Sequence, residues 1–178
     1  MKQISQYITE AFKIRKREHR QHTIIPKTRK ELKSIINERL KKDKNAYLND
    51  IDVSNIIDMS ELFDKLDPYN IDISEWNVSK VKNMYATFWG CENFNCDLST
   101  WDVYNVTNMS YMFMYCKKFN SDLSNWDVSN VKNMERMFSD CKKFNSNLND
   151  WDVSKYKNMK DMFNNCRSLK NKPSWYKK

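Results

Sequence analysis

The chain has 178 residues, a net charge of +8 and a single glycine, and 40% of its residues are hydrophobic. This length fits one domain with at most an appendage. The 30% charged content and the lack of any run of about 18 apolar residues exclude a membrane-spanning helix.

The positive charge is concentrated at the N-terminus. Residues 1–50 contain 14 Lys and Arg against 6 Asp and Glu, whereas the rest of the chain contains 17 of each. Because the rest of the chain is neutral, a nucleic acid could bind only the first quarter of the chain. By charge alone, nucleic acid is therefore disfavoured as a partner. Binding there would weaken steeply with salt.

Residues 1–22 form a basic amphipathic arm. Its apolar residues have the i, i+3, i+4, i+7 spacing of one helix face, and a basic run, residues 13–17, follows them. A secretory signal needs the opposite order. An interfacial membrane helix is an alternative, but the apolar face is short, which favours a partner-docking or targeting arm. The apolar residues are Ile4, Tyr7, Ile8, Ala11 and Phe12.

Residues 23–49 are expected to contain a capping helix. Thr28 and Glu31 have the T-x-x-E spacing of a capping box, and apolar residues follow at helical spacing before the basic run at residues 41–45. An amphipathic helix directly before a repeat is typical of a cap on the open end of a repeat stack.

Residues 50–178 are built from a repeat of 25 residues. A fixed period of this length is typical of a solenoid, in which each repeat buries its apolar face against the next. Pro173 replaces the leucine of the repeat and indicates a C-terminal cap. The repeating columns include Trp76, Trp101, Trp126 and Trp151; Met59, Met84, Met109, Met134 and Met159; Phe63, Phe88, Phe113, Phe138 and Phe163; and Cys91, Cys116, Cys141 and Cys166.

The spacing within one repeat predicts its local structure. Met134, Met137, Phe138 and Cys141 lie at i, i+3, i+4 and i+7, which predicts a short helix with one buried stripe. The Leu-x-x-Trp limb predicts a short extended segment. The predicted fold is therefore α/β: a leucine-rich-repeat-like solenoid of about five coils, each with a short strand and a short helix, and with an N-terminal helical cap.

The sequence contains no catalytic constellation, so we expect a protein that is not an enzyme and needs no cofactor or metal. A single glycine excludes a phosphate-binding loop. The cysteine column is expected to supply reduced packing residues. Repeated Asp and Asn columns are assigned to turns and to a hydrogen-bonded ladder, because catalytic sites are not repeated. These columns are Asn77, Asp102, Asp127 and Asp152, and Asn95, Asn120 and Asn145.

The motif F-N-x-D-L-S-x-W-D-V-S-N-V-x-N-M-x-x-M-F-x-x-C, read at Phe119–Cys141, resembles the bacterial surface protein repeat of the BspA-like leucine-rich-repeat group. This repeat is also found in mycoplasma lipoproteins. The lead-in at Pro26–Phe63 resembles the segment that commonly precedes such repeats. The resemblance covers residues 26–170 and implies a leucine-rich-repeat-like solenoid, protein-binding roles and often a cell-surface location.

The first residues support an alternative. Surface members of that group carry a signal peptide or lipoprotein cysteine, and this sequence shows neither, so an intracellular or virion-associated location is favoured over the cell surface. Residues 1–11 are similar to leaders that target internal proteins into the heads of tailed bacteriophages. Such leaders are cut after a hydrophobic-x-Glu tripeptide, here between Glu10 and Ala11. The alternative function is thus a virion or head-packaged protein.

Positions at which the repeats differ are the candidate binding site, because a variable column is free of the stacking constraint. Two repeats place aromatic and methionine side chains at positions expected to be exposed, a composition typical of interface cores. A packing role under the N-terminal arm is the other interpretation. The main hypothesis is a module that binds another protein. The candidate contact residues are Tyr85, Trp89, Tyr104, Tyr111, Met114 and Tyr115.

Overall fold

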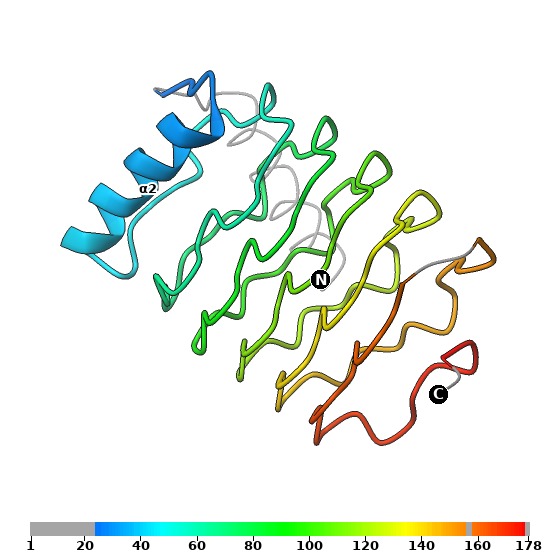
Figure 1. Ribbon diagram of the computed structural model, residues 1–178. Coiled ribbons are helices and arrows are strands. Elements are labelled where there is room, and N and C mark those ends of the chain that lie inside the picture. Colours follow the sequence, from blue (N-terminus) through cyan, green and yellow to red (C-terminus); the bar gives the residue numbers. More distant parts are fainter. Residues whose placement is uncertain (1–23, 156–157, 177–178) are drawn as a thin grey trace, which may run out of the picture.

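The computed structural model describes residues 24–155 and 158–176. This part of the chain contains one α-helix, α2 (Arg29–Lys42), followed by a row of similar coils (Figure 1). Its β structure consists of isolated parallel bridges. No helix among the described residues is long and apolar enough to cross a membrane. The arm at residues 1–22 lies outside the described residues, and the division into arm, cap and repeats stays a prediction.

Helix α2 lies within residues 23–49, where the sequence predicted a helix. The hydroxyl of Thr28 accepts the backbone N–H of Glu31 at 3.2 Å, which satisfies one of the free N–H groups at the helix start. The buried face of α2 consists of Leu32, Ile36 and Leu40, each at most 1% exposed. The helix lies beside the first coil, at one end of the row (Figure 1).

Two arginines attach α2 to the coils. Arg39 makes two hydrogen bonds to the carboxylate of Asp50, at 2.6 and 2.8 Å, and donates to the carbonyl oxygen of Tyr47 at 2.6 Å. The hydrogen bond to Asp50 is the main cause that raises the pKa of Arg39. Arg29 donates to the carbonyl oxygen of Ser60 at 2.7 Å. The cap is therefore held by planar, charge-assisted bonds as well as by apolar packing.

The coils stack with a register of 25 residues. Parallel bridges join Asp58 to Asn83, and the same column continues through the following coils to Asn108, Asn133 and Asn158. After the bridge residue of each coil, alternate backbone N–H groups donate to carbonyl groups of the next coil. In the fourth coil the donors of these bonds, 2.7–3.0 Å long, are Met134, Arg136, Phe138 and Asp140.

The predicted α/β leucine-rich-repeat-like solenoid is wrong, because the coils contain neither the expected helix nor the expected strand. The amides of Met137, Ser139 and Cys141 each bond the carbonyl group three residues earlier, as in successive β-turns. The Leu-x-x-Trp limb is also a turn, in which the amide of Trp126 donates to the carbonyl oxygen of Leu123 at 3.1 Å.

Left-handed residues explain why no helix forms. Two positions that are four residues apart have φ of +51 to +72° in every coil, which interrupts the right-handed conformation that a helix requires. Gly90, the only glycine, occupies one of these positions. The two columns are Glu61, Ala86, Tyr111, Arg136 and Asp161, and Lys65, Gly90, Tyr115, Asp140 and Asn165.

The predicted core columns are confirmed. Phe113 is fully buried, stacks on Phe88 and Phe138 in the neighbouring coils at 5.5 and 5.7 Å, and stacks on Phe119 of its own coil at 4.0 Å. Each column cysteine donates its thiol to a carbonyl oxygen of the preceding coil, as Cys141 does to Phe113 at 2.9 Å. The cysteines are therefore packing residues.

Asp and Asn side chains stabilise turns by accepting the backbone N–H group two residues later. The carboxylate of Asp127 accepts the backbone N–H of Ser129 at 2.9 Å, and the equivalent bonds recur at Asn77, Asp102 and Asp152. The predicted asparagine ladder is also confirmed. The side-chain oxygen of Asn95 accepts the N–H of Asn120, and that of Asn120 accepts the N–H of Asn145.

The last described coil ends in aromatic residues. Pro173 is buried at the position where other coils have leucine. The indole of Trp175 stacks on Trp151 at 6.3 Å and donates to the carbonyl oxygen of Leu148 at 2.8 Å, and Tyr176 packs edge-on against Phe163. These contacts cover the core end that a further coil would otherwise cover.

Candidate interaction surface

The structure brings two of the predicted contact residues together. The rings of Tyr85 and Tyr111, on the second and third coils, meet edge to face with centroids 5.8 Å apart. Tyr85 is 37% exposed and Tyr111 is half-buried. We call these two residues the tyrosine pair. Their columns hold small or charged residues in the other coils, so the pair is a local feature of the stack.

Glu135 of the fourth coil extends the tyrosine pair. The Tyr111 hydroxyl donates to its carboxylate at 3.0 Å. Desolvation, followed by the hydrogen bond to Glu135 and its negative charge, raises the pKa of Tyr111. Arg136 and Asp161 form an ion pair at 3.2 Å next along this surface. The phenol is therefore held in one orientation by the neighbouring coil.

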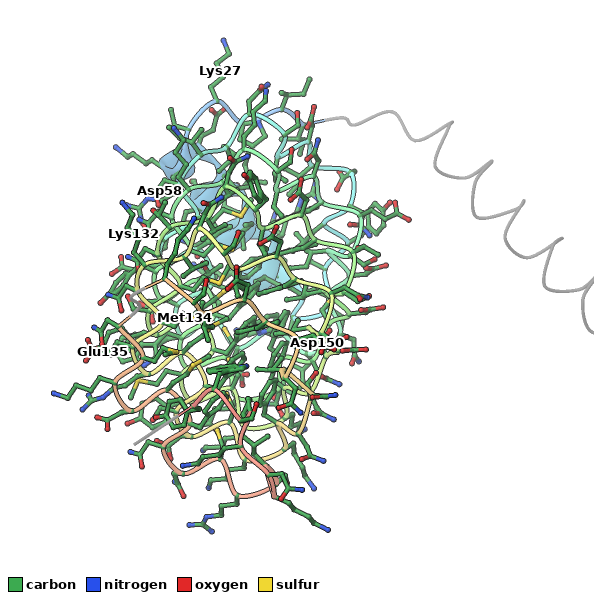
Figure 2. The ribbon with its side chains drawn as sticks, turned by 90° about the vertical axis from the view of Figure 1, so that its right-hand side faces the viewer. Lys27, Asp58, Lys132, Met134, Glu135 and Asp150 are labelled. Atoms are coloured by element: carbon green, nitrogen blue, oxygen red, sulfur yellow. The ribbon has the colours of Figure 1, made fainter. Side chains whose placement is uncertain are left out.

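Figure 2 shows where Glu135 lies. Asp58, Lys132 and Glu135 lie along one side of the molecule, and Asp150 lies on the opposite side. Met134, directly before Glu135, is fully buried between them. The position of Glu135 places the acidic neighbour of the tyrosine pair on the outer surface of the stack.

Two predicted contact residues are less accessible than expected. Met114 is 9% exposed and belongs to the core edge. Trp89 is half-buried, with the Lys65 ammonium 4.6 Å from its ring centroid in a cation–π contact. The indole Nε1 of Trp89 is buried and has no hydrogen-bond partner among the described residues. Both side chains therefore support the surface more than they form it.

The remaining predicted contact residues are exposed but separate. Tyr115 is 39% exposed, in the left-handed position four residues after Tyr111. Tyr104 is 51% exposed, in an Asp102 turn on another limb of the coil, and no ring contact joins it to the other candidates in the described part of the chain. The six candidates are thus not one contiguous patch.

Sequence reasoning missed a set of cations, because the repeat body is neutral as a whole. The two positions after each column cysteine lie side by side in successive coils, since the amide of Lys143 donates to the carbonyl oxygen of Lys117 at 3.1 Å. The repeated Cys-Lys-Lys tripeptides were the sequence signal that could have revealed these cations. We call this set the basic ridge: Lys117, Lys118, Lys142, Lys143 and Arg167.

The predicted processing residues Glu10 and Ala11 lie outside the described residues, and the phage-leader interpretation stays a prediction. Within residues 24–155 and 158–176 no group of three or more His, Cys, Asp or Glu side chains is arranged to hold a metal ion. Burial raises the pKa of Cys116 and Cys141 well above the ordinary value, so these thiols are poor nucleophiles at neutral pH.

Comparison with known proteins identifies the family. A family model described as "Mycoplasma protein of unknown function, DUF285" matches residues 30–126 and 98–177. No curated protein and no solved structure matches the chain. The expected relation to repeat proteins of the mycoplasma type is thereby shown, whereas the BspA-like leucine-rich-repeat assignment is finer than this match. Because the two matches together cover well over half of the chain, the protein belongs to the DUF285 family.

Proposed function

We propose that this protein is a non-enzymatic repeat module that binds another protein, in the manner of BspA-like repeat proteins. The observation that carries the proposal is the tyrosine pair, Tyr85 and Tyr111. The two rings meet edge to face on neighbouring coils, and Glu135 holds the hydroxyl of Tyr111. Tyrosine is enriched at binding hot spots because it buries a large area with few rotatable bonds.

The repeat itself explains why the tyrosine pair stands out. Tyr85 aligns with Ser60 and Ser110, and Tyr111 aligns with Ala86 and Arg136, so neither tyrosine is required for stacking. A large aromatic side chain that stays partly in contact with water contributes little to the stability of the free protein, and it can bury that surface in an interface. The pair is therefore a feature that the stacking of coils does not demand.

The repeated residues of the columns favour a scaffold over an enzyme. The aspartates, asparagines and cysteines that repeat in the sequence are engaged in turns, ladders and buried thiol contacts. Side chains that have the same structural role in every coil do not form a single active site. The repeated columns therefore support binding as the function, and the partner is to be identified by experiment.

The test is a pull-down from native lysate with the full chain as bait, followed by affinity measurement with the partner identified. The double variant Tyr85→Ser/Tyr111→Ser should lose at least roughly tenfold in affinity, as expected for a hot-spot pair. Circular dichroism and thermal unfolding would establish that the variant still folds.

The matched control is Tyr47→Ser/Tyr69→Ser. These tyrosines are 55% and 50% exposed and lie outside the tyrosine pair, so their removal should leave the affinity within about twofold of wild type. Equal affinities for wild type and the Tyr85/Tyr111 variant would show that the tyrosine pair is not the contact surface.

A further inference from the structure

The basic ridge has an unusual arrangement of charge along the stack. One column contains five charged residues in successive coils, and their sign changes once, from acidic in the first two coils to basic in the last three. The adjoining column adds Lys118 and Lys143. The five residues of the charged column, in order, are Asp67, Glu92, Lys117, Lys142 and Arg167.

Opposite charges on neighbouring coils form ion pairs on this protein. Arg136 bonds Asp161 at 3.2 Å, and Lys117 bonds Glu92 at 2.5 Å at the point where the column changes sign. Beyond this point like charges face each other, which destabilises adjacent strands and turns. No carboxylate lies within ion-pair distance of Lys142 or Lys143 among the described residues. A purely structural role does not explain this uncompensated charge.

The lysines are held in register and remain accessible. The amide of Lys118 donates to the carbonyl oxygen of Glu92 at 3.1 Å, and that of Lys143 donates to Lys117 at the same distance. The phenylalanine rings that directly follow the lysines are buried, and they stack with their centroids 6.1 Å apart in neighbouring coils. The Lys118, Lys142, Lys143 and Arg167 side chains are exposed.

This spacing suits one kind of partner. In an extended peptide, side chains on one face recur every two residues, or roughly 6.6 Å. Carboxylates at alternate positions would therefore face successive coils of the basic ridge. A nucleic acid carries charge along its whole length, and the acidic part of the column, Asp67 and Glu92, would repel its continuation past the ridge. The short positive segment favours an acidic stretch of limited length.

We propose that the basic ridge binds an acidic, extended segment of a partner protein, with carboxylates at alternate positions. This inference rests on the proposed protein-binding function and names the chemistry of the segment that is recognised. Asn120 and Asn145, exposed in the ladder beside the ridge, supply side-chain amides that can donate hydrogen bonds to the same segment.

The experiment uses the full chain and a fluorescent nine-residue peptide with glutamate at every second position, followed by fluorescence anisotropy in 0.15 M salt. Binding should weaken at least roughly tenfold in Lys142→Glu/Lys143→Glu and should also weaken as salt is raised. The matched control is Lys82→Glu/Lys132→Glu, which reverses two exposed lysines outside the ridge and should bind the peptide within about twofold of wild type.

Three outcomes would overturn the inference. They are no binding of the peptide, equal losses in the ridge and control variants, and tighter binding of a single-stranded oligonucleotide that depends on the same lysines. Peptide binding by Tyr85→Ser/Tyr111→Ser should equal that of wild type. Failure at the ridge is thereby separated from failure of the tyrosine pair, which is measured with the natural partner.

Discussion

The indole Nε1 of Trp126 donates a hydrogen bond of 2.9 Å to the carbonyl oxygen of Leu98 in the preceding coil. The same oxygen accepts the backbone N–H of Trp101 at 3.1 Å, so it closes a turn in its own coil and anchors the next coil. The relationship recurs at Trp76, Trp101 and Trp151, with distances of 2.9–3.0 Å. The tryptophan column is thus a chain of hydrogen bonds that fixes the register of the stack.

Trp126→Phe is expected to lower the free energy of unfolding by about 1–3 kcal/mol, measured by denaturant titration. The hydrogen bond to Leu98 is lost and the smaller ring packs less well against Phe113, although the Leu98 oxygen keeps its bond from Trp101.

Trp175→Phe is the control for this prediction. The Trp175 side chain makes the equivalent bond but is half-buried at the last coil, so its replacement should cost less. Equal costs at the two positions, or none at Trp126, would contradict the importance of the column for register.

Gly90→Ala should destabilise the protein by about 1 kcal/mol, because an alanine in the left-handed region is strained. Gly90 has φ of +72°, and a Cβ there would lie 3.5 Å from Cγ of Lys65, which is an ordinary contact. The cost therefore comes from the backbone and not from a clash. Thermal and denaturant unfolding would measure it.

Gly90→Asn separates the two causes. Asparagine tolerates the left-handed region, and Asn165 occupies the same position in the fifth coil. The asparagine variant should be more stable than the alanine variant despite its larger side chain. The reverse order would show that space around Lys65, and not the backbone conformation, sets the cost.

Stability should fall as the pH rises above 9, because the buried thiols resist ionisation. Burial raises the pKa of Cys91 and Cys166 to about 12 and that of Cys96 to about 11, from an ordinary value of 9.0. Between pH 9 and these raised pKa values, the unfolded chain has lost thiol protons that the folded chain keeps. The unfolded state then binds fewer protons, so its relative free energy falls with increasing pH.

Cys96→Ser isolates one thiol in this pH window. Serine already occupies the equivalent positions Ser121 and Ser146, whose hydroxyls accept the backbone N–H groups of Leu98 and Leu123. Between pH 8 and pH 10.5 the free energy of unfolding should fall by about 1–2 kcal/mol less in the variant than in wild type. Denaturant titrations at each pH would measure this difference. The same fall in both proteins would show that Cys96 ionises equally well folded and unfolded.

Much of the candidate surface could be predicted from the sequence, but its arrangement could not. Columns that vary between repeats indicated Tyr85 and Tyr111, and the structure joins the two rings. Burial of Met114 and the position of Tyr104 on a separate limb depend on the path of the coil, which the repeat does not reveal. The 25-residue period already placed Lys117 and Lys142 in one column, whereas the ion pair that Lys117 makes with Glu92 is seen only in the structure.

The sequence by itself determined the period, the register, the buried columns and the capping helix, because each depends on which residues recur and at what spacing. The tertiary structure alone decided the conformation within a coil. Met134, Met137, Phe138 and Cys141 have the spacing of a helix face, and successive turns bury the same four side chains. Inter-coil hydrogen bonds form only after stacking, and they hold Arg136 in the left-handed region against its local preference.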